Sequence, residues 1–372
     1  MHITFVLPTA SLGGGTRVVA IYAQRLQRRG HDVQVISLPP RLPSVRKRLR
    51  SLLRDHRWLT AATSPHSHLD GTDVHHTVID RWRPVCDHDI PDGDVVIATW
   101  WETAEWVNAL SATKGAKAYF VQGHEVFPRQ PADRVKATYS MSFHKIVVSK
   151  VLAKLMREVY GARDVSLVPN SVDTEQFTSE PRGKQRVPTV GLLYSPAYVK
   201  GCDISLRAFE LVRGSLGEAR LLAFGLSDPV ENLPLPAGTK YVKQPPQDRI
   251  RDVYGQCDVW LCGSRSEGFH LPPLEAMACR CPVVSTYVGG PADTIENGVN
   301  GYLVEPENFS ALAERVVQVI SMPDQHWKEM SHAAYATAMR YTWEDATKRF
   351  EAALVTAMER SQNRTLGSEG PL

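Results

Sequence analysis

The chain begins with a pattern of apolar and polar positions that predicts one strand–helix–strand unit. Residues 3–7 form an apolar run suited to a buried strand, and a glycine-rich turn follows at 13–15. Residues 18–26 then repeat apolar side chains at helical spacing, and residues 33–37 form a second apolar run. Because helical periodicity between two short apolar runs is typical of a crossover between parallel strands, this opening predicts an α/β fold.

The same alternation continues through the first half and then starts again in the second. In the first half, apolar runs predict further strands at 94–99, 117–122, 145–149 and 165–168. In the second half they predict strands at 189–194, 220–224, 259–262 and 282–286, with a helix through 204–212 and a last helix from residue 343. Two successive series of this kind predict two domains, each built on a parallel sheet.

The composition is that of a soluble globular protein and excludes several other classes. The 372 residues are 43% hydrophobic and 22% charged, and the net charge of +3 is too small to indicate a nucleic-acid partner. No apolar run is long enough to span a bilayer, and the apolar run at the N-terminus is too short for a secretion signal. We therefore expect a cytoplasmic protein.

Two groups of potential metal ligands do not have the spacing of a metal site. Cys257, Cys262, Cys279 and Cys281 crowd one region, but their spacings are not those of a zinc ribbon, and cysteines in strand-like runs behave as small hydrophobes. The run 87–89, Asp-His-Asp, lies in a loop outside any strand end, and we interpret it as a solvated turn. We expect no metal in the functional site.

The segment with the clearest chemistry is 266–278, in which two glutamates stand eight residues apart around a glycine and two prolines. An apolar strand precedes it, and the prolines suit the first turn of a helix. Glu267 then lies in the loop after a strand, and Glu275 lies early in the helix. A helix N-terminus can hold a phosphate, so a carboxylate on either side of it suits a nucleotide-sugar. Two solvated glutamates at a helix start are the alternative.

Residues 258–306 closely resemble the donor-binding half of retaining glycosyltransferases of family GT4, of the bacterial surface-polysaccharide type, and 169–173 resemble the domain junction of that family. The resemblance implies the GT-B fold, an α/β architecture of two Rossmann-like domains whose parallel sheets face each other across a cleft. It implies an acceptor-binding domain at 1–170 and a nucleotide-sugar-binding domain at 171–342. A final helix at 343–360 would pack back on the first domain, and a polar tail at 361–372 would be disordered.

The resemblance also implies which residues carry the chemistry. Glu267 would contact the transferring sugar, Lys200 would stabilise the leaving diphosphate, and His124, at the end of a first-domain strand, would lie near the reacting centre. Donor-binding roles would fall to Gly14, Gly15, Asn170, Arg265, Gly268, Phe269, His270, Leu271 and Glu275. His270 replaces the second glycine of the family motif. The arginine that the family places near the strand end at Gly191 is missing, and Arg265 is a candidate substitute.

The expected activity is that of a retaining, metal-independent hexosyltransferase without a cofactor. It would move a sugar from a UDP-, GDP- or dTDP-sugar to a hydroxyl of a saccharide or lipid-linked saccharide. A GT-B-like sugar-nucleotide epimerase and a non-catalytic nucleotide-sugar-binding protein are the alternatives. A dehydrogenase is disfavoured, because Val18 stands where the dinucleotide fingerprint needs glycine.

Residues 41–58 form a basic segment with apolar residues at helical spacing. This pattern is typical of a helix that lies on an anionic membrane surface, and it is equally typical of an ordinary helix with one face against a sheet. On the first interpretation the protein would associate with the inner leaflet of the plasma membrane and act there on a lipid-linked acceptor.

Overall fold

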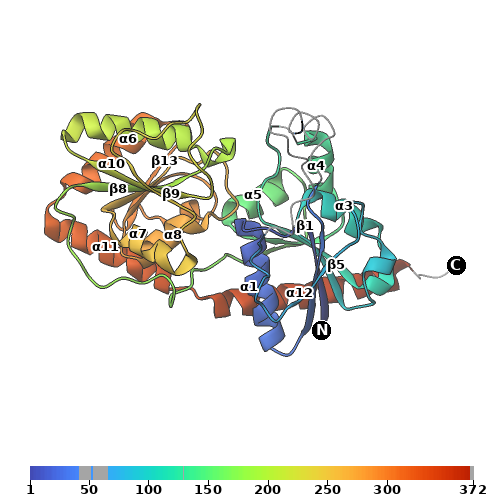
Figure 1. Ribbon diagram of the computed structural model, residues 1–372. Coiled ribbons are helices and arrows are strands. Elements are labelled where there is room, and N and C mark those ends of the chain that lie inside the picture. The colour runs from blue at the N-terminus through green and yellow to red at the C-terminus, as the bar shows by residue number, and fades with distance from the viewer. Residues whose placement is uncertain (42–51, 53–65, 129, 369–372) are drawn as a thin grey trace. The chain divides into compact units, whose positions relative to one another are not determined.

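The computed structural model describes residues 1–41, 52, 66–128 and 130–368 (Figure 1). The described chain divides into two compact units. The N-terminal unit contains Met1–Val147, Met156–Ser166 and Thr347–Leu372, and the C-terminal unit contains Val148–Leu155 and Leu167–Ala346. The chain therefore enters the C-terminal unit once before its main crossing, through residues 148–155, and returns to the N-terminal unit at its end.

In the described part of the N-terminal unit, seven strands form one sheet in the order β3-β2-β1-β4-β5-β6-β7. The pairings that join β1 through β6 are parallel. The strands are β1 His2–Thr9, β2 Asp32–Leu38, β3 His75–Val78, β4 Val95–Ala98, β5 Ala116–Val121, β6 His144–Val147 and β7 Val165–Leu167. The order reverses between β1 and β4, where loops after neighbouring strands diverge to opposite faces and leave room for a ligand.

The helices whose bounds lie within the described residues of this unit are α1 Gly14–Arg28, α3 Trp101–Ala109, α4 Ala132–Ser140 and the last helix α12 Trp343–Ser368, with short 3₁₀ turns at Asp87–Asp89 and Ala112–Lys114. Helix α5, Lys150–Glu158, contributes only its last three residues, 156–158. Helix α12 closes the core. Its Phe350 is fully buried and stacks on Tyr22 of α1 with ring centroids 4.3 Å apart, and its edge meets Phe120 of β5 at 5.1 Å.

The C-terminal unit repeats the plan with six parallel strands in the order β10-β9-β8-β11-β12-β13 among its described residues. They are β8 Thr189–Tyr194, β9 Arg220–Gly225, β10 Lys240–Lys243, β11 Val259–Cys262, β12 Val283–Thr286 and β13 Gly301–Val304. Its helices are α6 Cys202–Leu216, α7 Ile250–Gly255, α8 Leu271–Ala278, α9 Pro291–Thr294, α10 Phe309–Ser321 and α11 Asp324–Met339, with 3₁₀ turns at Tyr198–Lys200 and Gln247–Arg249. Figure 1 shows α6 and α10 on one face of this sheet and α7, α8 and α11 on the other.

The predicted α/β class is confirmed, and each predicted apolar run coincides with a strand to within a residue or two. The sequence analysis did not predict three strands, β3, β10 and β13. All three lie at sheet edges and are short. Neither β3 nor β10 has a buried residue, so the sequences of these two strands lack an apolar run. Helix α12 continues to Ser368, past the predicted end at residue 360 and into the segment that we expected to be disordered.

Of the predicted basic helix at 41–58, only Arg41 and Leu52 are among the described residues, so that prediction lies outside what the structure describes. No helix in the described ranges is both long enough and apolar enough to cross a membrane.

The packing of α12 can be tested through Phe350. Replacement by alanine leaves a cavity among Phe5, Tyr22 and Phe120, and we expect it to lower the free energy of unfolding of the N-terminal unit by about 3–5 kcal/mol. Val355→Ala on the same helix is the control, because Val355 is 43% exposed. Urea unfolding, monitored by hydrogen exchange of the backbone amides of β1 and β5, measures the effect of both substitutions. Equal effects of the two substitutions would contradict this account of the core.

Candidate functional site

The predicted site residues of the C-terminal unit lie where its strand order reverses. Strand β8 leads into the loop that holds Lys200, and its neighbour β11 leads into the loop that holds Glu267. Because both strands are parallel, their carboxyl ends share one edge of the sheet. Such a reversal point is where open α/β sheets bind ligands, so the topology brings the two residues together although they are far apart in sequence.

Lys200 and Glu267 form a largely buried ion pair at this edge of the sheet. The Lys200 Nζ lies 2.9 Å from each carboxylate oxygen of Glu267, and the Ser264 hydroxyl donates to Glu267 Oε1 at 2.9 Å. The Glu267 side chain is 8% exposed and that of Lys200 is 32% exposed. Burial alone would raise the pKa of Glu267, but the neighbouring His270 and Lys200 and the hydrogen bonds from Lys200 and Ser264 outweigh it and lower the pKa. Glu267 is therefore a buried carboxylate that stays ionised.

Glycine at position 201 is required for this pair. Gly201 has a left-handed backbone, with φ 52°, and a Cβ there would collide with the carbonyl of Gly263. The loop after β8 thus packs directly against the backbone of the loop after β11. The Ser205 hydroxyl accepts a hydrogen bond from the Gly263 N–H at 2.8 Å and fixes the same contact. This close approach places the lysine beside the glutamate.

Helix α8 begins directly after this pair, and His270 is its N-cap residue. His270 has φ 70°, a conformation that costs a non-glycine residue free energy. Its side chain is 3% exposed, its Nε2 lies 3.6 Å from Glu267 Oε1, and its Nδ1 is buried without a hydrogen-bond partner. Burial lowers the pKa of His270 to about 4, so the ring is neutral near pH 7. A strained, buried imidazole with an unpaired nitrogen indicates a role beyond packing.

The double proline changes the expected anion site at the start of α8. Pro272 and Pro273 occupy its first turn, as predicted, and proline has no N–H to donate. The first turn therefore offers fewer N–H donors than an ordinary helix N-terminus. The helix dipole remains, but side chains must supply part of the hydrogen bonding to an anion.

Glu275, the second glutamate of the motif, lies inside the unit. It is 4% exposed, and it accepts a hydrogen bond from the buried Tyr254 hydroxyl at 2.8 Å. Sequence reasoning missed Tyr254, because nothing in the spacing of α7 links it to the motif. Because Tyr254 already donates to Glu275, a ribose bound by Glu275 would share the carboxylate with the Tyr254 hydroxyl or displace that hydroxyl.

The other donor-binding candidates fall into two groups. Gly268, Phe269 and Leu271 lie in the loop and first turn around His270, and the Gly290 N–H donates to the Phe269 carbonyl at 2.7 Å. Asn170 is buried with its Oδ1 unpartnered, so it has hydrogen-bonding capacity to offer.

Arg265 differs from these candidates. Its guanidinium contacts Asp203 at 2.7 Å and Glu307 at 2.5 Å, so the structure does not present it as a free cation for phosphates. Its charge is already compensated by two carboxylates. Among the predicted cations, Lys200 is therefore the one placed next to Glu267.

The predicted residues of the N-terminal unit lie at the corresponding edge of its own sheet. His124 follows β5, is half-buried, and its Nε2 lies 2.7 Å from the Tyr160 hydroxyl. Burial lowers the pKa of His124, so its ring is neutral near pH 7. Gly14 and Gly15 form the N-terminus of α1 after β1, and a Cβ at Gly14 would meet nothing within 4 Å. No contact with a described residue explains that glycine.

A pocket of about 710 Å³ in the N-terminal unit was not predicted. It opens beyond the carboxyl ends of β2 and β3, between them and α3. Its walls include Trp82, Trp106, Arg41 and Glu102. The guanidinium of Arg41 lies 3.8 Å over the Trp82 ring and 2.7 Å from Glu102, and Trp82 meets Trp106 edge to face at 6.0 Å. The tryptophans carried no periodic signal that could have linked them from sequence.

One group of potential metal ligands lies close together among the described residues, at Cys86, His88 and Asp89. The 3₁₀ turn there agrees with the predicted turn. Arg83 holds both oxygens of Asp89, at 2.6 and 2.7 Å, so a cation would have to displace a guanidinium from the carboxylate. These residues therefore do not fit a metal ion.

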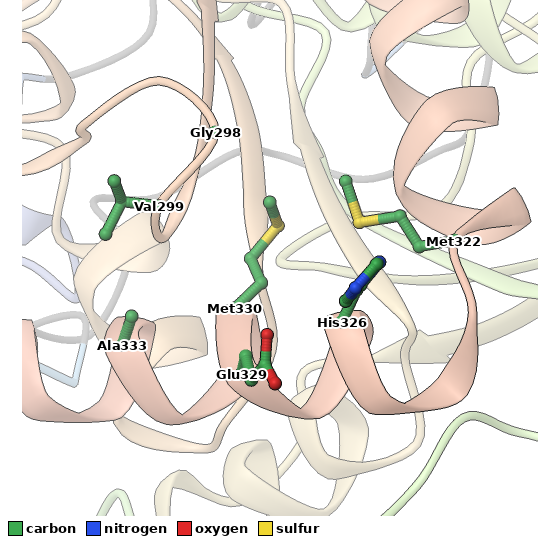
Figure 2. A pocket seen from close by; sticks show the side chains of 7 residues that line it. All are labelled: Gly298, Val299, Met322, His326, Glu329, Met330 and Ala333. Atoms are coloured by element: carbon green, nitrogen blue, oxygen red, sulfur yellow. The ribbon is translucent and has the colours of Figure 1, made fainter.

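A further pocket, of about 410 Å³, lies on α11 of the C-terminal unit. Figure 2 shows the side chains of Met322, His326 and Met330 around it, with Val299 and Gly298 across from them. Met330 also belongs to the core that α6 and α10 form against the sheet. The pocket contains none of the predicted site residues, and its lining is that of a gap at the edge of the core.

Comparison with known proteins identifies both halves of the chain. Residues 12–176 match the family model described as Glycosyltransferase Family 4, and residues 173–337 match the model described as Glycosyl transferases group 1. The D-inositol 3-phosphate glycosyltransferase of Nocardiopsis dassonvillei is 32% identical over 200 residues, which cover 46% of each chain. The enzyme of the same name from Corynebacterium urealyticum is 33% identical over 125 residues, 33% of this chain and 29% of that protein. The chain thus matches less than half the length of these curated relatives.

Among solved structures, the chain is similar to Alr3699/HepE of Anabaena, crystallised in complex with UDP. The TM-score is 0.69 at 16% identity, over 96% of this chain and all of the other. At that identity the likeness shows the fold.

The environment of His270 predicts a measurable titration. With a pKa of about 4 in the folded state against about 6.5 in the unfolded chain, the unfolded state binds more protons between these values. Stability is therefore complete above pH 6.5 and falls as the pH drops from about 6.5 to 4. NMR of the His270 ring should show a midpoint near pH 4, and His270→Gly should be less sensitive to acid. A midpoint near 6.5 would contradict the buried, neutral ring.

Proposed function

Because the chain belongs to the family 4 glycosyltransferases with the GT-B fold, we propose that it is a retaining, metal-independent hexosyltransferase that uses a nucleotide-diphospho-sugar. The acceptor would be a hydroxyl of a saccharide, in the synthesis of a polysaccharide or lipid-linked saccharide. UDP is the first nucleotide to test, since the similar HepE structure was obtained with UDP.

The observation that carries the proposal is the ion pair of Lys200 with Glu267 at the start of α8. Without a donor each group satisfies the other. When a nucleotide-sugar binds, the half-exposed lysine can turn to the diphosphate, where negative charge accumulates as the leaving group departs. The buried glutamate then faces the sugar, on which positive charge develops. One pair thus supplies both of the charges that transfer requires.

His270 completes the phosphate site in this proposal. The two prolines remove N–H donors from the first turn of α8, and the unpartnered Nδ1 of His270 lies at that same turn. A neutral imidazole protonated on Nδ1 donates one hydrogen bond. The family's glycine cannot do this, so the substitution compensates for donors that the prolines lack.

The nucleoside would be held by Glu275, whose carboxylate accepts hydrogen bonds from ribose hydroxyls. Lys200, the helix dipole and His270 would take the role that a divalent cation has in metal-dependent transferases. We therefore propose that neither a metal nor a cofactor takes part.

The role of Glu267 is tested by Glu267→Gln, which keeps the shape of the side chain and removes its charge. We expect transfer to fall about a hundredfold or more, while UDP affinity changes little, because the carboxylate acts on the sugar. Glu218→Gln is the control, since Glu218 is exposed and outside the site. Calorimetry with UDP and a radiolabelled transfer assay measure the two effects. Unchanged turnover in Glu267→Gln would refute the assignment.

The same assay tests the reaction class. Activity should survive EDTA, and NMR of the product should show that the donor's anomeric configuration is kept. Inversion, or activity that returns only with added manganese, would contradict the proposed mechanism. Interconversion of the donor without an acceptor would indicate an epimerase.

For the acceptor we propose the 710 Å³ pocket of the N-terminal unit, which has the size of a small-molecule site. Its three arginines are already paired with carboxylates: Arg41 with Glu102 at 2.7 Å, Arg134 with Glu105 at 2.6 Å, and Arg81 with Asp80 at 3.7 Å. A charge-balanced lining with an indole wall suits a neutral sugar, whose ring would replace the Arg41 guanidinium over the Trp82 face and whose hydroxyls would bond to the charged groups.

Trp82→Ala removes this indole wall. We expect the KM for the acceptor to rise roughly tenfold, the effect of about 1.4 kcal/mol from one aromatic contact, with the KM for the donor unchanged. Val159→Ala, at a residue that is 65% exposed in the same unit, is the control. Steady-state kinetics with each substrate varied in turn separate the two constants. A rise confined to the donor KM would place the acceptor elsewhere.

A further inference from the structure

The C-terminal unit has a cavity of about 330 Å³ with a concentration of cationic side chains. It lies between the segment that leads into β8, the turn after α8, and α11. Its lining residues are Pro181, Arg182, Gly183, Arg280, Lys328, Ser331 and His332. None of these residues belongs to the proposed donor or acceptor sites.

Two of the basic side chains, Arg280 and His332, have no acidic partner among the described residues. The Arg280 Nε donates to the Ser179 carbonyl at 2.8 Å, and its guanidinium lies 4.0 Å over the Tyr335 ring, but no described carboxylate pairs with it. His332 is exposed and likewise forms no ion pair with a described residue. Arg280 and His332 are therefore both available to bind an anion in the cavity.

The other two cations are only partly compensated. Arg182 donates to the carbonyls of Cys257 and Gly183, its nearest carboxylate is Asp258 at 4.0 Å, and its Nε is buried without a partner. Lys328 pairs with Asp324 at 2.8 Å, in a contact that is half exposed and so weakly stabilising. Clustered like charges repel one another, and a bound anion would relieve that repulsion.

We infer that this cavity is a binding site for a small phosphate monoester, with Arg280, His332 and Lys328 around the phosphate. The volume exceeds that of a bare phosphate and falls at the lower end of small-molecule pockets. A guanidinium group can donate two parallel hydrogen bonds to two oxygens of one phosphate. The Ser331 side chain and the Lys328 methylenes line the part of the cavity that would hold the rest of the ligand.

The site is distinct from the proposed donor site, although the two share a helix. Arg280 follows the C-terminal end of α8, just after the C-cap residue Cys279, whereas His270 caps the N-terminal end. An eight-residue helix is about 12 Å long, so one phosphate cannot contact both ends.

The test titrates the full chain with inorganic phosphate and with glucose 6-phosphate at constant ionic strength, followed by ³¹P NMR and calorimetry. We expect saturable binding of glucose 6-phosphate, tighter than that of inorganic phosphate. Arg280→Gln and His332→Glu should each weaken it at least tenfold. His332→Glu places a carboxylate in the cavity at an exposed position, so it should fold even if Arg280→Gln is destabilised.

Arg207→Gln is the matched control, because Arg207 lies 3.9 Å over the ring of Phe309 in the same unit and should bind as the wild type does. Lys200→Ala separates this site from the donor site and should keep the binding. Loss of binding in Lys200→Ala but not in His332→Glu would overturn the inference and assign the anion to the donor site. Equal binding of inorganic phosphate and glucose 6-phosphate, or no saturable binding to the wild type, would also overturn it. Either result leaves the proposed transfer reaction untouched.

Discussion

The candidate donor site depends on a close backbone contact between the loops after two neighbouring strands. Strands β8 and β11 adjoin where the order of the sheet reverses, and Gly201 lets the first loop rest on the Gly263 carbonyl of the second. Any side chain at position 201 would force the loops apart and carry Lys200 away from Glu267. Without that lysine, Glu267 would be a buried charge with only the Ser264 hydroxyl and the neutral His270 ring beside it, and burial would then favour its protonated form.

The 710 Å³ pocket of the N-terminal unit and the 330 Å³ cavity of the C-terminal unit differ in charge, and this difference favours a neutral ligand in the first and an anion in the second. In the N-terminal unit, the cations that line the pocket have carboxylate partners, so a neutral ligand can exchange hydrogen bonds without leaving a charge unpaired. In the C-terminal unit, the cavity at Arg280 has more cations than acids, so a neutral ligand would leave the repulsion in place. Volume alone would not have separated these cases, because both cavities fall in the range of small-molecule sites.

Much of the fold could be predicted from the sequence, because buried parallel strands are continuous apolar runs and the runs at 3–7 and 259–262 are of this kind. Edge strands such as β10 have no buried residue and no such signal. In the site, spacing and resemblance singled out Lys200 and Glu267, but neither could reveal that the guanidinium of Arg265 is bound by Asp203 and Glu307. Ion pairs of that kind form between residues far apart in sequence, and only the fold determines which of them meet.

His270 shows how a departure from a family pattern can be interpreted physically. Its left-handed backbone would suit the family's glycine better, and its ring is buried with one nitrogen unpaired, so the residue carries two energetic costs. The neighbouring prolines carry a cost of another kind, because they deprive an anion of N–H donors. In the proposed donor site the two features would be linked: a histidine at the cap would supply a donor at the turn from which the prolines removed two, and an anion bound there would pair the free Nδ1.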